Sequence, residues 1–365
     1  MADIQLRFHH DMLVLSTPIE SQLARIGIDA VRDNELTLLL EPEVLDEIYA
    51  LESAAGAQCI VADTAFMTPA RLAHSGMREN AAKLAEHALN AAAAKTPQHI
   101  LVELGPCGLP LDASSKASLN ENRDQYKRAA ETFADREPLF DAYFLNGFTS
   151  CTDLKCALMG MRKVTDKPIF ASVDIAVEGE GDADATPAAG ASADVTPADV
   201  TPAAINPAMS AMTLGGKGRE TLGQAVAVMA EYGAQVTGFQ TAASPDYAAR
   251  LVREACEASF LPVLAQLRVR DINPEQNAPT EANPYYEPDV MVDAADILKA
   301  AGAQFLRAAG NATPSYTGAL VAATVGDSVT RPTPFSAAVQ TSTPSDPPSE
   351  LAERLRKRIN EALGN

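Results

Sequence analysis

The stretch RETLGQAVAVMAEYGAQVTGFQTAASPDYAARLVREACEASFLPVLAQLRV, residues 219–269, alternates helix-like and strand-like segments. Residues 219–232 and 245–258 have helical patterns, whereas 234–239 and 262–269 are short, largely apolar runs. Tyr232-Gly233-Ala234 joins the first helix to its strand, and glycine just past a helix C-terminus is a common stop. Apolar strands that alternate with helices are typical of a parallel sheet that is buried on both faces.

The same alternation extends through most of the chain. Eight strands alternating with eight helices predict an α/β fold, a (β/α)8 TIM barrel over residues 1–325. An open doubly wound sheet would usually carry a Gly-x-Gly-x-x-Gly motif after its first strand, and none is present there. The other strand candidates are 12–16, 59–63, 99–104, 141–145, 168–174 and 303–308, and the other helical patterns are 42–53, 79–94, 121–134, 153–162, 289–301 and 315–323.

A low-complexity insertion, residues 176–217, follows the fifth predicted strand. It is rich in Ala, Pro, Thr and Asp, and it has too few large apolar side chains to offset the entropy of ordering. We expect a disordered loop at the carboxyl face of the barrel. It could act as a mobile lid, or it could have no role.

The C-terminal region also departs from the alternation. Residues 326–348 are rich in Pro, Ser and Thr and predict a flexible linker. Residues 349–365 predict an amphipathic helix with one apolar stripe, which packs back on the barrel or docks to a partner protein. The stripe consists of Leu351, Leu355, Ile359 and Leu363.

Composition limits the class of protein and of partner. The 365 residues are 47% hydrophobic and 21% charged, as expected for a globular protein. The net charge of −19 argues against nucleic-acid and anionic-membrane partners. Five cysteines without a Cys-x-x-Cys pair suit a reducing cytoplasm, and no signal-peptide core or membrane-spanning run is visible. We therefore expect a cytoplasmic protein that acts on a small molecule.

Five segments together resemble one family. They are 42–66 (PEVLDEIYALESAAGAQCIVADTAF), 102–108 (VELGPCG), 145–158 (LNGFTSCTDLKCAL), 218–245 and 283–316. In this order they resemble the homocysteine S-methyltransferase barrel, including the N-terminal homocysteine-binding module of cobalamin-dependent methionine synthase. The resemblance implies methyl transfer to homocysteine or another acceptor. The donor would be a methylated corrinoid on a partner protein, or an S-methyl or N-methyl small molecule.

The chain departs from this family at its zinc site. In the family, one Cys follows the sixth strand in Gly-x-Asn-Cys, and two follow the eighth strand in Gly-Gly-Cys-Cys. Here these motifs read Gly238-Phe239-Gln240-Thr241 and Arg307-Ala308-Ala309-Gly310, so Thr241, Ala309 and Gly310 replace the three zinc ligands. Zinc deprotonates a bound thiol, and these residues cannot replace three thiolates. We therefore expect no zinc cofactor and a diverged site.

Polar residues at the carboxyl ends of the predicted strands are the candidate substrate-binding residues. Asp63 and Asp174 are candidate proton acceptors or cation ligands, and Arg307 is a candidate anion clamp. Alternatively, Arg307 pairs with an acidic neighbour, and the two aspartates cap helices or satisfy loop amides. The full set is Asp63, Thr64, Asn146, Asp174, Gln240, Thr241, Arg307 and Asn311.

The sequence is also compatible with other sites and functions. Cys107 and Cys151 could form a relocated metal site with Asp63 or Asp174, although idle thiols are commoner. Tyr285-Tyr286 could cover an apolar ligand or anchor a loop. The chain could also be a non-catalytic barrel that binds a corrinoid protein or a methyltransferase partner through its C-terminal helix. A third hypothesis is a lyase or isomerase that uses Asp63 and Asp174.

Overall fold

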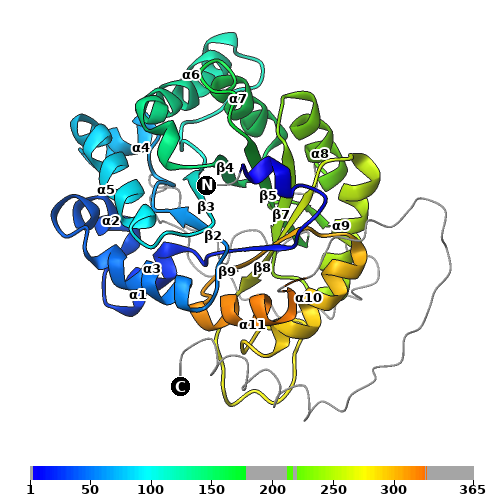
Figure 1. Cartoon of the computed structure of the whole chain (residues 1–365). Helices are drawn as coiled ribbons and strands as arrows, with labels where there is room; N and C mark the ends of the chain where they lie inside the picture. The colour runs from blue at the N-terminus through cyan, green and yellow to red at the C-terminus, as the bar shows by residue number, and fades with distance from the viewer. Residues whose placement is uncertain (1–2, 178–211, 217–219, 325, 327–365) are drawn as a thin grey trace, which may run out of the picture.

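Eight parallel strands close into a barrel in the computed structural model, which describes residues 3–177, 212–216, 220–324 and 326. Neighbouring strands follow the order β4-β3-β2-β1-β9-β8-β7-β5, and the pairing of β4 with β5 closes the ring (Figure 1). The TIM barrel predicted from the alternation is therefore confirmed. The strands are β1 (Leu13–Leu15), β2 (Cys59–Ala62), β3 (His99–Leu104), β4 (Ala142–Phe148), β5 (Ile169–Val177), β7 (Val236–Thr241), β8 (Val263–Val269) and β9 (Phe305–Gly310).

Helices surround the barrel because each buries one apolar face against the strands (Figure 1). A capping box, in which Thr221 and Gln224 exchange hydrogen bonds, starts α8, and Gly302 at φ 108° ends α10. The helices are α1 (Ile19–Arg25), α2 (Ala30–Leu40), α3 (Val44–Ala54), α4 (Pro69–His74), α5 (Ala81–Ala93), α6 (Lys116–Phe133), α7 (Cys151–Met161), α8 (Leu222–Glu231), α9 (Pro245–Ala258), α10 (Val290–Ala301) and α11 (Pro314–Thr324). Three short 3-10 helices are η1 (Ile4–Arg7), η2 (Arg78–Asn80) and η3 (Ala134–Leu139).

The structure differs from the sequence prediction at both ends of the insertion. Strand β5 extends to Val177, and β6 (Met212–Leu214) pairs antiparallel with it. The predicted disordered loop over 176–217 is therefore wrong for residues 176–177 and 212–216. The rest of the insertion, the linker after residue 326 and the predicted helix 349–365 lie outside the described residues.

The barrel interior is apolar toward the amino ends of the strands. Helix η1 closes this end: Ile4 is fully buried, and Phe8 packs edge-on against Phe170 and Phe305. Strand residues of the same interior cluster are Leu13, Leu15, Cys59, Val61, Leu101, Ala142, Phe144, Phe170, Val236, Leu264 and Phe305. Because side chains alternate along a strand, the residues two positions further on point into the carboxyl half of the barrel.

Candidate functional site

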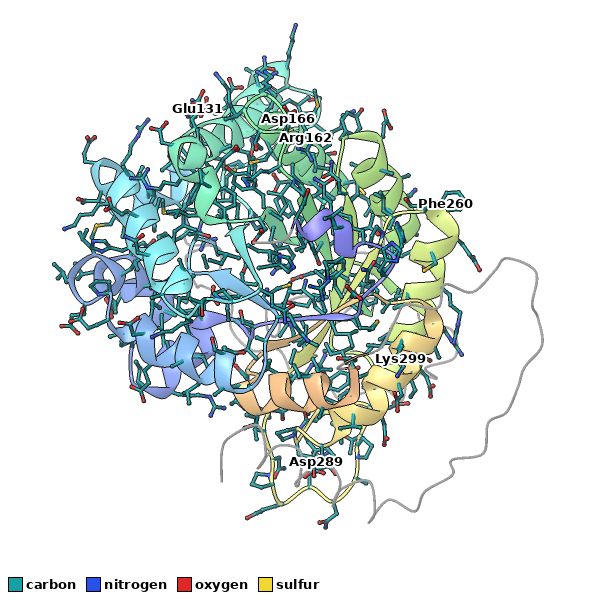
Figure 2. All side chains as sticks on the ribbon, viewed as in Figure 1. Glu131, Arg162, Asp166, Phe260, Asp289 and Lys299 are labelled. Carbon is teal, nitrogen blue, oxygen red and sulfur yellow. The ribbon has the colours of Figure 1, made fainter. Side chains whose placement is uncertain are left out.

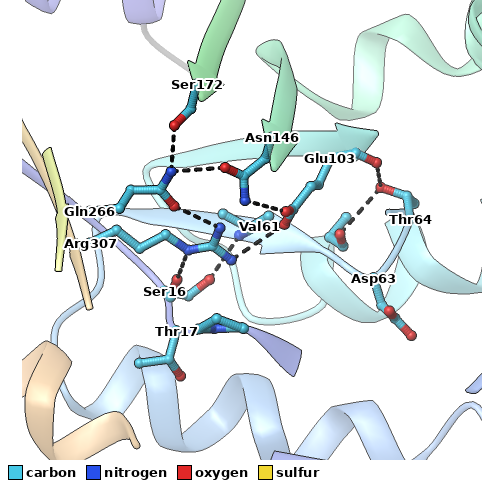
Figure 3. A network of polar contacts seen from close by, with 12 residues as sticks. Ser16, Thr17, Val61, Asp63, Thr64, Glu103, Asn146, Ser172, Gln266 and Arg307 are labelled. Carbon is cyan, nitrogen blue, oxygen red and sulfur yellow. Dashed lines mark hydrogen bonds and ion pairs between the residues drawn. The ribbon is translucent and has the colours of Figure 1, made fainter. Parts of the chain in front are cut away.

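A layer of polar side chains lies above the apolar interior, at the carboxyl half of the barrel. Each member follows an interior apolar residue of its own strand by two positions, as Glu103 follows Leu101 and Arg307 follows Phe305. Figure 3 shows that these side chains come from different strands and converge. We call this layer the polar floor; it consists of Glu103, Asn146, Ser172, Gln266 and Arg307.

Arg307 lies at the centre of the polar floor and is only 2% exposed. Its Nε donates to the backbone oxygen of Ser16 at 2.9 Å, and its Nη1 donates to Oε1 of Gln266 at 3.3 Å. Its Nη2 forms an ion pair with Oε2 of Glu103 at 3.3 Å. The guanidinium is therefore engaged by the protein itself, as in the ion-pair alternative and not as an open anion clamp.

Two amide side chains complete a closed ring of hydrogen bonds (Figure 3). Gln266 Nε2 donates to Oδ1 of Asn146 at 2.8 Å and to Oγ of Ser172 at 2.7 Å. Asn146 Nδ2 in turn donates to Oε1 of Glu103 at 2.7 Å. Because Arg307 and Glu103 both have further hydrogen-bonding partners, their ion pair can stay buried. The polar floor is thus a fixed surface beneath the carboxyl end.

A second polar cluster lies nearer the carboxyl ends of the strands. It consists of Asp174 on β5, Gln240 on β7 and Arg268 on β8. Arg268 Nη2 donates to Oδ2 of Asp174 at 3.2 Å, and the two side chains are about a quarter exposed. In the amide orientation that satisfies both groups, Gln240 accepts from Nε of Arg268 at 2.9 Å. Burial raises the pKa of Asp174 although Arg268 lies beside it. Oδ1 of Asp174 is buried and has no partner among the described residues.

Asp63 lies across the barrel, at the end of β2. Its Oδ1 accepts from Asn34 at 2.9 Å, while its buried Oδ2 has no partner within the described part of the chain. Desolvation, opposed by the Asn34 hydrogen bond and reinforced by nearby Glu20, raises the pKa of Asp63 to about 8. Desolvation, followed by the charge of Glu103, also raises the pKa of Glu20 at the start of α1. Asp63 therefore holds its proton at neutral pH.

The remaining predicted site residues have local structural contacts. Thr64 Oγ1 donates to the backbone oxygen of Glu103 at 2.8 Å, and Oγ1 of Thr241 accepts from the Ala243 amide at 3.2 Å. The Asn311 side chain donates to the backbone oxygen of Arg270. The structure therefore gathers Asn146 and Arg307 in the polar floor and Asp174 and Gln240 around Arg268. It holds Asp63 apart, since β3 and β4 separate β2 from β5.

The loop tyrosine Tyr285 anchors a loop to the barrel. Its hydroxyl donates to the backbone oxygen of Ala243 at 2.7 Å, and its own backbone oxygen accepts from Tyr316 at 3.0 Å. The side chain is fully buried. These contacts agree with the prediction that Tyr285 anchors a loop, and not with the alternative that it covers an apolar ligand.

Sequence reasoning missed Glu103, Gln266 and Arg268. All three lie within the predicted strands 99–104 and 262–269, where strict alternation from Leu101 and Leu264 would have placed them in the barrel interior. Glu20 had no comparable signal, because α1 itself was not predicted.

The residues at the three family zinc positions do not fit a zinc ion. They lie at the ends of β7 and β9, where Thr241 offers a hydroxyl, Ala309 a methyl group and Gly310 no side chain. Zinc sites in proteins use thiolate, imidazole or carboxylate ligands. Over the residues that the structure describes, no three His, Cys, Asp or Glu side chains are placed to hold a metal ion.

The two cysteines near this end are held as thiols. The Cys107 sulfur lies 3.1 Å from Oδ1 of Asn122, and burial raises its pKa. Burial, followed by the charge of Glu220, raises the pKa of Cys151 to about 12. Metal binding requires the thiolate, so neither environment favours the relocated metal site.

The chain is similar to one known family of proteins. The family model described as homocysteine S-methyltransferase matches residues 14–324. No curated protein matches at a significant level. Two solved structures of the homocysteine methyltransferase MmuM from Escherichia coli, the metallated and oxidised forms, match 86% of this chain and 96% of theirs. Their identities are 14% and 15%, and their TM-scores are 0.61 and 0.62.

The identities to these structures are low, so they show the shared barrel fold only. None of the described helices is long and apolar enough to cross a membrane.

Proposed function

Because the chain belongs to the homocysteine S-methyltransferase family, we propose that it transfers a methyl group to a small acceptor without the family's zinc ion. The donor is a methylated corrinoid on a partner protein, or a small S-methyl or N-methyl compound. The acceptor binds at the carboxyl end of the barrel, above the polar floor.

One observation carries this proposal. The three positions that hold zinc in the family offer Thr241, Ala309 and Gly310, whereas charged side chains surround the same end of the barrel. A free thiol is only a few per cent ionised at neutral pH. Without a metal, the acceptor proton therefore needs a protein group to receive it.

Glu20 is the group we assign to this role. It lies at the start of α1, and desolvation, followed by the charge of Glu103, raises its pKa above that of an ordinary glutamate, which makes it a stronger proton acceptor. The acceptor lone pair forms the bond to the methyl carbon. The bond from this carbon to the donor breaks with its electron pair on the donor, and the acceptor proton goes to Glu20.

A methyl-transfer assay with metal control tests the proposal. Purified full chain is incubated with homocysteine and a ¹³C-methyl donor, either methylcobalamin, a methylsulfonium amino acid or an N-methyl betaine. Labelled methionine is measured by mass spectrometry, with and without a chelator. We expect transfer that the chelator does not change, and far less than one zinc per chain by elemental analysis.

The controls separate the proposal from its alternatives. Glu20→Gln should lower the rate by about 10²-fold or more, whereas Glu47→Gln on the exposed face of α3 should leave it unchanged. About one zinc per chain, or inhibition by the chelator, contradicts the zinc-free reaction. Absence of transfer from all three donors contradicts this enzymatic proposal and favours a non-catalytic barrel that binds a corrinoid or methyltransferase partner.

A further inference from the structure

Large apolar side chains are exposed on the helices that follow β1. Leu36 and Leu40 on α2 are 44% and 67% exposed, and Leu51 on α3 is 50% exposed. Ile26 and Val31, at the turn between α1 and α2, are more than half exposed as well. Figure 1 shows α1, α2 and α3 together on one side of the barrel, and α2 contacts both of the others. Exposed apolar side chains gathered in one region of a surface mark an interaction site.

Helix α2 is apolar on two opposite sides. Leu38 is buried, whereas Leu36 and Leu40 lie on the outer side, four residues apart and therefore adjacent on the helix surface. A helix with apolar side chains all round is normally buried on every side. We call the outer side of α2, with Leu36 and Leu40, the apolar face; the described residues leave it exposed to solvent.

Acidic residues surround the apolar face. Asp33 precedes Leu36 by three positions and Asp29 precedes it by seven, so both lie on the same side of α2. Glu41 follows the last residue of the helix. None of these three carboxylates takes part in an ion pair among the described residues, and residues 29–47 contain seven acidic residues and one basic residue. A segment that covers this face should therefore be apolar along its centre and basic at its edges.

The C-terminal segment of the chain has this pattern. Residues 349–365, which lie outside the described residues, carry one large apolar residue at every fourth position: Leu351, Leu355, Ile359 and Leu363. At about 100° per residue, a helix over this segment has Arg356 on one side of the apolar stripe and Arg354 and Arg358 on the other. The stripe would be about 18 Å long, close to the roughly 16 Å of α2.

The chain leaves the barrel close to the apolar face. Val321, near the end of α11, packs against the end of α3: a Cβ atom on Gly56 would lie 2.9 Å from its Cγ1. Helix α3 contacts α2, so the apolar face lies about two helix spacings away, or about 20 Å. A coil of 24 residues has an average end-to-end distance of about 27 Å. Residues 325–348 are therefore long enough to make the connection.

We propose that residues 349–365 form a helix that docks on the apolar face of α2 in the same molecule. The apolar stripe of the segment covers Leu36 and Leu40, and its flanking arginines lie beside Asp29 and Asp33. This docking does not depend on the proposed methyl transfer.

The same charges favour this occupant over a second copy of α2. Two apolar faces in contact would bring the unpaired acidic groups of both copies together, which is unfavourable. The tethered segment instead brings basic groups, and tethering gives it a millimolar effective concentration. An isolated helix of 17 residues is only marginally stable in water. Packing on α2 would supply the stability that the segment lacks alone.

Hydrogen exchange measured by mass spectrometry tests the docking in the full chain. Amides of residues 351–363 should exchange at least about tenfold more slowly in the full chain than in a synthetic peptide of residues 349–365. In a chain that ends at residue 348, the amides of α2 should exchange up to about tenfold faster than in the full chain. Amides of α6 should be unchanged, and thermal melts confirm that the shortened chain is folded.

Variants locate the docking site. Leu36→Asp/Leu40→Asp in the full chain should raise the exchange of residues 351–363 to the rate of the free peptide. Leu36→Ser/Leu40→Ser serves the same purpose if the aspartate pair impairs folding. Met159→Asp is the matched control, since Met159 is an exposed apolar residue on α7, and it should change nothing.

A charge variant tests the basic edges of the segment. Arg354→Glu/Arg358→Glu should speed the exchange of the α2 amides, because the reversed charges would meet Asp29 and Asp33. The effect should shrink at high salt, which screens charges between exposed groups.

Three results overturn the inference. The first is exchange of residues 351–363 at the free-peptide rate in the full chain, and the second is unchanged protection of this segment in folded Leu36→Ser/Leu40→Ser. The third comes from analytical ultracentrifugation: a full-length dimer that either Leu36/Leu40 variant converts to a monomer assigns the apolar face to a second copy instead. A monomer at every concentration, with the predicted exchange pattern, supports docking within one chain.

Discussion

At the scale of single residues, the carboxyl half of the barrel depends on charges that are buried only because they are paired. The guanidinium of Arg307 is 2% exposed, and Glu103 is its ionic partner. Breaking such a pair by removing one member leaves an uncompensated buried charge, which costs far more than the intact pair contributes.

Glu103→Leu should therefore lower the free energy of unfolding by about 3–5 kcal/mol, because Arg307 would stay buried without its carboxylate. Urea denaturation measures the change. The double variant Glu103→Leu/Arg307→Met should lose much less than the sum of the two single variants. Strict additivity would show that the two side chains do not interact in solution.

Asp63 should make the stability depend on pH. Its pKa is about 8 in the folded protein and near 4 in the unfolded chain, so the folded state binds more protons between these values. Stability should fall as the pH rises from about 4 to 8. Asp63→Asn should flatten this slope and stabilise the protein at pH 9 by at least about 1.4 kcal/mol, the value of one pKa unit. Urea unfolding at pH 6 and 9 tests this, with exposed Glu47→Gln as a control that leaves the slope unchanged.

Gly310→Ala should destabilise the protein. The positive φ costs an L-residue about 1–3 kcal/mol, and the new Cβ would also meet the Val269 backbone at 2.5 Å. Gly108 also has a positive φ, but a Cβ there has open space around it. Gly108→Ala should therefore cost less, and equal losses in a melting experiment would show that the close approach to Arg268 and Val269 is unimportant.

At the scale of elements, the junctions between helices and strands are held by specific side chains. Arg162 follows α7; Figure 2 labels it in the outer layer, near Asp166. Its guanidinium donates to the backbone oxygens of Gly233, Thr165 and Lys167 at 2.6–3.1 Å, and to Oε1 of Gln235. One arginine thus ties the connection before β5 to the turn before β7.

Arg162→Ala should lower the free energy of unfolding by about 2–3 kcal/mol, since several carbonyl groups lose a charged donor at once. Denaturant titration measures the loss, and Arg136→Ala, which loses an ion pair at 3.7 Å, should cost less than about 1 kcal/mol. Similar losses for both variants would show that the junction does not depend on Arg162.

Strands were the elements most accessible from the sequence, because most barrel strands contain a short, largely apolar run. The helix predicted over 245–258 matches α9 residue for residue. Helices α1 and α4 have only seven and six residues, too few for a repeating apolar stripe, and α2 exposes Leu36 and Leu40. Strand β6 escaped prediction because three residues within a low-complexity segment carry no periodic signal.

The candidate site was less predictable than the fold. Loop and strand-end positions identified Asn146, Asp174, Gln240 and Arg307, but not their partners. Which partner a charged side chain meets depends on register between strands far apart in sequence, as for Arg307 and Glu103. A single sequence contains no direct record of that register.

At the scale of the whole molecule, the two ends of the barrel differ in the side chains that they bury. The amino end is closed by apolar packing of Ile4 and Phe8, and the carboxyl end carries the charged groups. Apolar packing and the buried polar groups of the polar floor are therefore separated along the barrel axis.

Removing residues 1–9 should lower the free energy of unfolding by about 3–5 kcal/mol, because Ile4 and Phe8 would no longer bury their side chains. Thermal melts of the full and the shortened chain test this point. Retention of full stability would show that η1 does not close the barrel in solution.

The ion pair of the polar floor joins residues 204 positions apart. On the ribosome, Glu103 leaves the exit tunnel long before Arg307 is synthesised, and a carboxylate without its partner resists burial. Nascent chains that stop short of β9 should therefore keep the upper part of the barrel hydrated and accessible to proteases. Once β9 has emerged, Arg307 can pair with Glu103, water can leave the carboxyl half of the barrel, and the ring of strands can close.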